Sequence, residues 1–150
     1  TFLCTQACLP HLKRAANPHV LNISPPLNLD PRWFAPHVAY TMSKYGMSLC
    51  VLGMAEEFRA RGIAVNALWP RTAIDTAAIV YLGGQVIAAR CRKPEIVADA
   101  ARAILTHDAR HCTGNFFIDD EVLRDAGVVD FGQYRQEAVA EQDLVPDFFV

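Results

Sequence analysis

Two short apolar runs with a long helical pattern between them constrain the fold of this chain more than any other feature. The runs are His19-Val-Leu-Asn-Ile-Ser24 and Ile63-Ala-Val-Asn-Ala-Leu-Trp69, and neither contains Asp, Glu, Lys or Arg. Uncharged runs of this length are typical of strands that are buried on both faces of a parallel sheet. The segment between them, residues 38–61, is apolar on most sides, and Gly62 follows it as a suitable C-cap. We therefore expect a strand, a helix and a second strand in one βαβ unit.

The remaining segments continue this alternation of helices and strands. The expected order is a helix at 1–15, a strand at 19–24, a helix at 38–61, a strand at 63–69, a helix that begins at Pro94-Glu95, and a strand at 115–118. Such an order predicts an α/β fold with a parallel sheet. The pattern from 71 to 92 is ambiguous because Gly83-Gly84 interrupts it. The tail from Glu121 to Val150 mixes charged and apolar residues, and no element is assigned to it.

Charge and composition exclude several classes of function. The formal net charge is -2 and Lys and Arg form no cluster, so no nucleic-acid partner is expected. The charge-free stretch from Tyr45 to Ala55 is shorter than the ~20 residues of a membrane-spanning helix, so no membrane partner is expected. The five histidines lack the spacing of metal ligands, and no metal is expected. The five cysteines are expected to be reduced thiols packed in a core, which, with the lack of a signal peptide, favours a cytoplasmic protein.

Tyr40 and Lys44 are the residues with the clearest chemical potential. They are four residues apart at the start of the long helix, so they share one face. A phenol has a pKa near ~10, and a nearby ammonium lowers that pKa, which makes Tyr40 a candidate general acid or base. Lys44 could also donate hydrogen bonds to the sugar hydroxyls of a coenzyme. Ser24 ends the preceding strand, at the edge where doubly wound sheets bind ligands, and its hydroxyl could polarise a substrate carbonyl.

Three segments together carry a resemblance to a known family. They are His19-Val-Leu-Asn-Ile-Ser24, Ala39-Tyr-Thr-Met-Ser-Lys-Tyr-Gly-Met-Ser48 and Gly62-Ile-Ala-Val-Asn-Ala-Leu-Trp-Pro70. In this order they resemble the short-chain dehydrogenase/reductase family, and the similarity extends over nearly the whole chain. The resemblance implies that residues 1–150 are a single partial domain, the C-terminal half of a Rossmann-type doubly wound parallel sheet.

The same resemblance implies an activity and the residues that perform it. The expected reaction interconverts a carbonyl and an alcohol on a lipid-like or other apolar small molecule, with NADP as the coenzyme and NAD as the alternative. Tyr40 would donate and accept the proton, and Lys44 would lower its pKa and hold the nicotinamide ribose. Ile74 and Thr76 would contact the nicotinamide end of the coenzyme, or they would serve only in loop packing. Residues 75–92 would form the substrate lid.

Several positions depart from the pattern of the family. The family has its serine further along the chain, whereas Pro25 and Pro26 follow Ser24 here. Ser24 therefore either polarises the carbonyl or hydrogen-bonds its own loop. Arg71 stands where the family has glycine, and it could pair with a phosphate or lie in solvent. Asp119-Asp120-Glu121 stands where the family has Asp-Gly-Gly, which alters a turn.

The Gly-rich turn that binds the coenzyme pyrophosphate does not occur in these residues. We therefore expect a fragment that is inactive alone and that exposes a sheet edge and a large apolar surface. In the full-length protein the apolar helix at 38–61 is expected to pair with a second copy, which predicts a homo-oligomer. Two alternatives remain open: the same fold could serve a coenzyme-retaining epimerase or dehydratase, or a non-catalytic binding or assembly protein.

Overall fold

A computed structural model describes residues 1–136 and 138–150, and the chain divides into two compact units. The first unit contains residues 1–69, 104–117 and Phe149, and the second contains residues 70–103, 118–148 and Val150. The first unit holds the strands and the long helix. That both units belong to a single partial domain stays a prediction.

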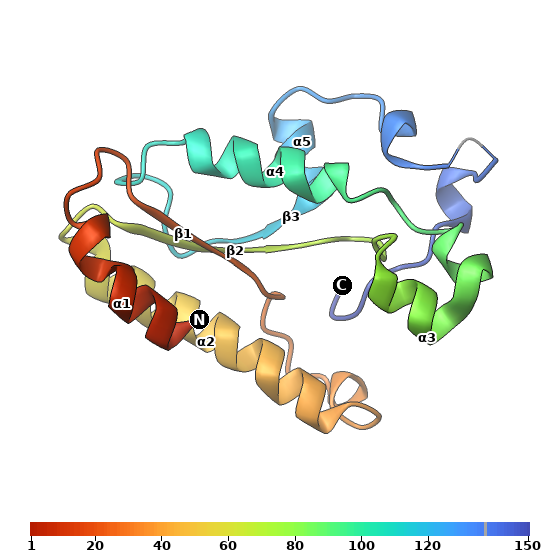
Figure 1. The fold of residues 1–150 in the computed structure, drawn as a ribbon, viewed down its shortest axis with the longest axis horizontal. Coiled ribbons are helices and arrows are strands. Elements are labelled where there is room, and N and C mark those ends of the chain that lie inside the picture. The colour runs from red at the N-terminus through yellow and green to blue at the C-terminus, as the bar shows by residue number, and fades with distance from the viewer. Residues whose placement is uncertain (137) are drawn as a thin grey trace. The chain divides into compact units, whose positions relative to one another are not determined.

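The first unit is built around a sheet in which β2 (Ala64–Trp69) lies between β1 (His19–Ile23) and β3 (Phe116–Ile118) (Figure 1). β1 and β2 run parallel, with Val20 paired to Val65. Every residue of β2 is buried, as expected for a central strand that is covered on both faces. The prediction of an α/β fold with a parallel sheet is confirmed. Among the described strands, β1 forms one edge of this sheet.

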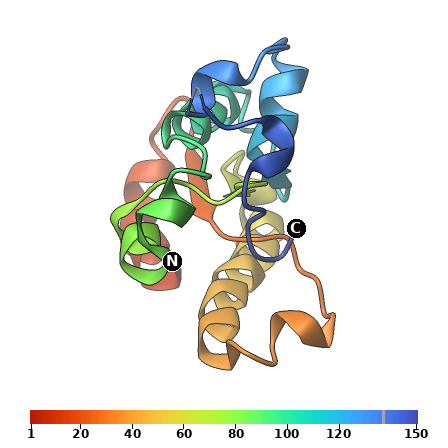
Figure 2. The ribbon, with the colours of Figure 1, turned by 90° about the vertical axis from the view of Figure 1, so that its right-hand side faces the viewer.

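α2 (Val38–Arg59) is the long helix that the sequence predicts, and it ends at Arg59 rather than at Arg61. Figure 2 shows that it runs beside the strands of the first unit. Its buried side chains recur every three or four residues, so they form one stripe toward the sheet. These residues are Thr41, Tyr45, Ser48, Val51, Met54, Ala55 and Phe58. Gly62 then adopts a φ of 66°, a left-handed conformation that suits glycine, and leads the chain into β2.

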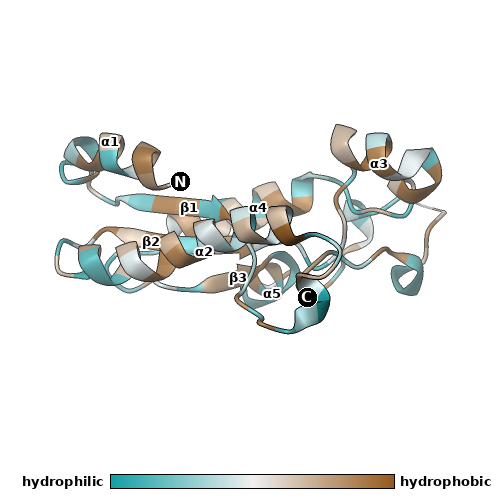
Figure 3. Ribbon diagram, turned by 90° about the horizontal axis from the view of Figure 1, so that it is seen from below, coloured by the Kyte–Doolittle hydropathy of each residue, from teal (hydrophilic) through white to brown (hydrophobic). Residues whose placement is uncertain are grey.

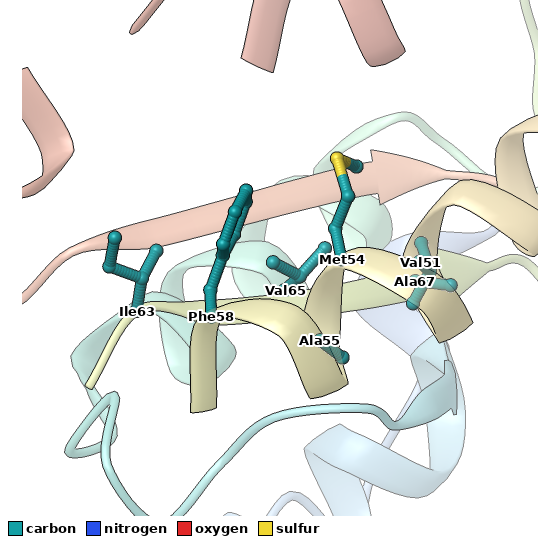
Figure 4. Close-up of a cluster of buried hydrophobic side chains, with 7 residues drawn as sticks. All are labelled: Val51, Met54, Ala55, Phe58, Ile63, Val65 and Ala67. Atoms are coloured by element: carbon teal, nitrogen blue, oxygen red, sulfur yellow. The ribbon is translucent and has the colours of Figure 1, made fainter. Parts of the chain in front are cut away.

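Figure 4 shows the hydrophobic core that forms between α2 and β2. Its members are Val51, Met54, Ala55, Phe58, Ile63, Val65 and Ala67. Leu9 and Leu12 of α1 (Phe2–Leu12) pack against this core. Burial of a large apolar side chain contributes ~1.5–3 kcal/mol to folding. The core therefore fixes α2 against β2, and it fixes the N-terminal turns of α2 near the ends of the strands.

α1 contacts the core through its last turn and leaves its other face in solvent. The helix ends at Leu12, and backbone turn hydrogen bonds continue as far as Ala15, where the sequence predicted the helix end. Cys4 and Cys8 are exposed on α1. The expectation that all cysteines pack in a core is therefore wrong for these two, and among the free cysteines of the described residues only Cys91 is buried.

A buried asparagine connects the sheet to the loop before β3. The side-chain oxygen of Asn66 accepts a hydrogen bond from the backbone N–H of Asn115 at 3.0 Å. Its side-chain amide donates to the backbone carbonyl of Cys112 at 2.7 Å. A polar side chain is stable inside a core when it has partners of this kind. Asn66 therefore holds a loop and takes no part in the chemistry proposed below.

The second unit contains α3 (Ala77–Ala88), most of α4 (Glu95–Thr106) and α5 (Asp119–Asp125). α4 begins where the sequence predicts it, whereas α5 lies at the start of a tail to which no element was assigned. Gly84, inside α3, has φ 71° and ψ 179°, a conformation that is almost restricted to glycine, so α3 is kinked there. Figure 3 shows that α3 is mostly hydrophobic.

Candidate active site

Tyr40 and Lys44 lie together on the first turns of α2, as their spacing predicts. The Nζ atom of Lys44 is 6.0 Å from the centre of the Tyr40 ring and 5.1 Å from the centre of the Trp69 ring. Nζ also donates a hydrogen bond to the backbone carbonyl of Ile23 at 3.4 Å. Ile23 ends β1 and Trp69 ends β2. The ammonium therefore lies at the carboxyl edge of two parallel strands, where sheets of this class bind ligands.

The two side chains differ in how freely they meet solvent. Tyr40 is 43% exposed. Lys44 is half-buried and is restrained by the Ile23 carbonyl and by two aromatic rings. An ammonium near a phenol favours the phenolate form. An accessible acid beside a restrained cation is an arrangement suited to proton transfer.

α2 also anchors the loop that follows β1. The Tyr45 hydroxyl donates to the backbone carbonyl of Asn28 at 2.6 Å and accepts from its N–H at 3.2 Å. The Ser48 hydroxyl donates to the backbone carbonyl of Pro25 at 2.7 Å. The sequence predicts an irregular loop here, but not its attachment. The sequence contained one indication of this attachment, because Tyr45 and Ser48 are polar residues on the buried stripe of an otherwise apolar helix.

Ser24 is fully buried, and in the part of the chain that the structure describes its Oγ atom has no hydrogen-bond partner. The hydrogen bond to its own loop that the sequence allowed is therefore not made. Pro25, which follows it, is buried as well. A substrate carbonyl could reach Oγ only after neighbouring groups move, and the carbonyl-polarising role of Ser24 stays a prediction.

Ile74 and Thr76 lie in the second unit. Ile74 is half-buried and forms an isolated parallel bridge with Arg92. Thr76 is the N-cap of α3, and its hydroxyl oxygen accepts a hydrogen bond from the N–H of Ile79 at 3.5 Å. Threonine is well suited to this role because it satisfies an N–H that has no partner within the helix. The contact of both residues with a coenzyme stays a prediction.

Two of the departures from the family pattern meet in the second unit. The Nε atom of Arg71 donates to both carboxylate oxygens of Asp120 at 2.9 Å, and its guanidinium also pairs with Glu121. The backbone N–H of Arg71 donates to Asp119 at 3.0 Å. Arg124 contacts Asp120 as well, at 2.7 Å. Among the described residues Arg71 pairs with carboxylates of α5 rather than lying free in solvent, and its pairing with a phosphate stays a prediction.

Burial and charge change the ionisation of this cluster. Burial raises the pKa of Asp119, and it outweighs the hydrogen bonds from the backbone N–H groups of Arg71 and Asp120, which lower that pKa. For Arg71, burial lowers the pKa, but the hydrogen bond and the charge of Asp120 together raise it above its ordinary value. The cluster thus contains a carboxyl that favours its proton next to an arginine that retains its charge.

Sequence reasoning missed two aromatic side chains next to Tyr40 and Lys44. The Trp69 ring lies beside the ammonium of Lys44, and the Phe149 ring stacks on the ring of Tyr40 at 6.2 Å between centres. Trp69 was assigned only to a buried strand, and Phe149 lies in the tail that had no assigned element. The contacts of these two rings with Lys44 and Tyr40 depend on tertiary packing, which the sequence pattern does not reveal.

The donors at this edge fit the sugar end of a nicotinamide coenzyme, because a phenol and an ammonium can both hydrogen-bond ribose hydroxyls. Across residues 1–136 and 138–150, no three His, Cys, Asp or Glu side chains are grouped so that they could hold a metal ion. Over the same residues, every helix is too short or too polar to cross a bilayer.

Comparisons with known proteins agree with this geometry. The family model for short chain dehydrogenases matches residues 1–82. The whole chain is 55% identical to hydroxysteroid dehydrogenase-like protein 2 of Danio rerio, but it spans only 35% of that relative. A solved protein of Xanthomonas campestris, assigned as a dehydrogenase, is 54% identical with a TM-score of 0.91, and the match covers 99% of this chain and 54% of that one.

A more distant solved structure holds a coenzyme. The landomycin C-6 ketoreductase LanV, with bound NADP and rabelomycin, is 25% identical with a TM-score of 0.56, and the match covers 79% of this chain and 45% of that one. The prediction of a partial Rossmann-type fold is confirmed by these superpositions. The family model covers β1, α2 and β2, and α2 carries Tyr40 and Lys44. The chain therefore belongs to the short-chain dehydrogenase family.

Proposed function

We propose that the full-length protein interconverts a carbonyl and an alcohol with a nicotinamide coenzyme, and that Tyr40 is its general acid and base. One observation carries this proposal: the Lys44 ammonium lies beside the Tyr40 ring at the carboxyl edge of β1 and β2. Membership of the short-chain dehydrogenase family supports an oxidoreductase. Because the chain spans about a third of its Danio rerio relative, the activity is proposed for the whole protein, and residues 1–150 alone are expected to be inactive.

In the direction of reduction, the Tyr40 phenol donates its proton to the carbonyl oxygen, and Lys44 stabilises the phenolate that remains. When bound, the dihydronicotinamide supplies the hydride that the carbonyl carbon accepts. Proton and hydride together convert the carbonyl into an alcohol. In the opposite direction the Tyr40 phenolate accepts the alcohol proton. Lys44 also donates hydrogen bonds to ribose hydroxyls and so orients the reacting partners.

NADP is the proposed coenzyme, with NAD as the alternative. The NADP found in LanV supports this choice. We propose that Ile74 and Thr76 contact the nicotinamide end, on the basis of the family resemblance. We also retain Ser24 as the group that polarises the substrate carbonyl, a role for which its burial requires the loop that begins at Pro25 to shift when substrate binds.

A lipid-like or other apolar small molecule is the proposed substrate. Residues 75–92, which include α3, are the proposed lid, and no charged residue occurs from Ala77 to Ala89. Several large apolar side chains of α3 are exposed, namely Tyr81, Leu82, Val86 and Ile87. Exposed apolar groups on a lid favour the burial of an apolar ligand. The name of the Danio rerio relative, which refers to hydroxysteroids, is consistent with such a substrate.

We further propose that the full-length protein is a homo-oligomer that associates through α2. Met42, Gly46, Leu49 and Gly53 are exposed and follow a spacing of four, three and four residues, which is the spacing of paired helices. A side chain at either glycine would meet no neighbouring part of this chain within 4 Å.

Five free cysteines support a reducing compartment such as the cytoplasm.

The first test uses the full-length protein with Tyr40→Phe. The oxidation of NADPH and of NADH would be followed against a panel of aldehydes, ketones and ketosteroids. We expect turnover that falls by at least ~100-fold in the variant, because general acid–base groups contribute about that much. Coenzyme binding, measured by calorimetry, should be retained and weakened only by the loss of the hydrogen bond that the Tyr40 hydroxyl can make to the ribose, because Lys44 remains.

Tyr134→Phe is the matched control. It removes a phenol that hydrogen-bonds Asp99 at 2.8 Å in the second unit, and turnover should be retained. Undiminished turnover in Tyr40→Phe would contradict the role of Tyr40. Tight coenzyme binding without turnover on any substrate would instead favour the epimerase or the non-catalytic alternative.

A further inference from the structure

Phe149 has an unusual position for a residue of an irregular tail. Only 2% of it is exposed, and its ring contacts four other aromatic rings of the first unit. The distances between ring centres are 5.2 Å to Tyr45, 5.7 Å to Trp33, 5.9 Å to Trp69 and 6.2 Å to Tyr40. Aromatic rings at 4.5–7 Å attract each other beyond the effect of area burial. Phe149 is thus the centre of an aromatic cluster, which consists of these five residues.

The backbone of Phe149 is strained. Its φ is 75°, and among the described residues no other non-glycine residue has a positive φ. A bulky side chain in the left-handed region is disfavoured, and such residues persist only where their surroundings hold them. The four rings around Phe149 are those surroundings. The backbone therefore adopts an unfavourable conformation at Phe149. As a result, the ring of Phe149 enters the aromatic cluster.

The cluster contacts both members of the proposed catalytic pair. Phe149 stacks on Tyr40 with an angle of 14° between the ring planes, so the two rings are nearly parallel. Trp69 contacts Phe149 on one side and the Lys44 ammonium on another. This stack therefore restrains the orientation of the Tyr40 ring.

We propose that Phe149 is a positioning residue of the proposed active site: its ring holds the ring of Tyr40 directly and the ammonium of Lys44 through Trp69. This inference rests on the function proposed above. It assigns to the tail a part in catalysis that does not involve contact with substrate or coenzyme. The expected consequence of losing the ring is a misplaced phenol, and small misplacements of a reacting group can lower rates by about 10²-fold.

The test compares variants of Phe149 in the full-length protein. Phe149→Ala should lower kcat by about 10- to 100-fold, while KM and the Kd of NADPH should change by less than about threefold. Phe149→Gly accommodates the positive φ but lacks the ring, so it should be as slow as Phe149→Ala. Phe149→Tyr retains the ring and should restore most of kcat. Phe148→Ala, a neighbouring and half-exposed phenylalanine, is the matched control and should leave kcat unchanged.

A second readout does not depend on turnover. Amide hydrogen exchange of residues 38–44 should be faster in Phe149→Leu, which keeps an apolar side chain but loses the stack, while the C-terminal half of α2 should be unaffected. A kcat of Phe149→Ala within twofold of the wild type, or an equal loss in Phe148→Ala, would overturn the proposal. So would unchanged exchange at residues 38–44. A wild-type protein without any carbonyl turnover would contradict the proposed function instead, and the exchange experiment would still decide the role of Phe149.

Discussion

At the residue scale, Arg71 and Asp120 show how two unusual residues compensate each other. Asp120 is buried, and both Arg71 and Arg124 pair with its carboxylate. Arg71 and Asp120 form an ion pair in which the Nε–H of Arg71 is shared between both oxygens of the buried carboxylate. Their partnership links the loop after β2 to the start of α5.

A double-mutant cycle tests this compensation. Asp120→Ala and Arg71→Ala should each destabilise the full-length protein, and their coupling energy in urea unfolding should be ~1–3 kcal/mol because the carboxylate is buried. The exposed pair of Arg59 and Glu56, at 2.8 Å, provides the comparison and should give ~0.5 kcal/mol or less. A coupling no larger than that of the exposed pair would show that Arg71 and Asp120 act independently.

Asp119 allows a prediction of pH dependence. Burial raises its pKa in the folded state, so its ionisation above pH ~4 costs native stability, and its stabilising contribution is present only at lower pH. Asp119→Asn cannot ionise and retains an oxygen that accepts the N–H of Arg71. The stability of this variant relative to the wild type should therefore increase as the pH rises from 4 to 7. Urea unfolding at both pH values measures the change, and a constant difference would argue against a raised pKa.

At the scale of elements, the segments with a single strong pattern were predictable. β1, β2 and α2 follow from uncharged runs and from apolar periodicity, which depend on burial alone. α3 was ambiguous because its kink depends on the positive φ of Gly84, which a sequence pattern does not reveal. α5 was missed because a helix of seven residues carries little periodicity.

The candidate site was predictable only in part, because some of its contacts are local in the sequence and others are not. The local spacing of Tyr40 and Lys44 determines their contact, so the sequence sufficed. The contacts of Phe149 with Tyr40, and of Arg71 with Asp120, join residues that are distant along the chain. Such pairs depend on how the elements pack, and a single sequence does not contain that information.

At the scale of the whole molecule, the exposed stripe of Met42, Gly46, Leu49 and Gly53 predicts how copies associate. Leu49→Glu places a charge in this stripe and should dissociate the full-length homo-oligomer, as measured by light scattering coupled to size exclusion. Val129→Glu, at an exposed apolar residue of the second unit, is the control and should not change the mass. A wild-type protein that is already monomeric would contradict association through α2.

α2 serves several purposes at once. One face packs on the sheet, and its first turns carry Tyr40 and Lys44. Its polar residues Tyr45 and Ser48 hold the loop after β1, and the exposed stripe is proposed to meet a second copy. Few positions on such a helix are free to vary without affecting one of these tasks. In a library of random substitutions, α2 should therefore tolerate fewer changes than any other helix of the chain.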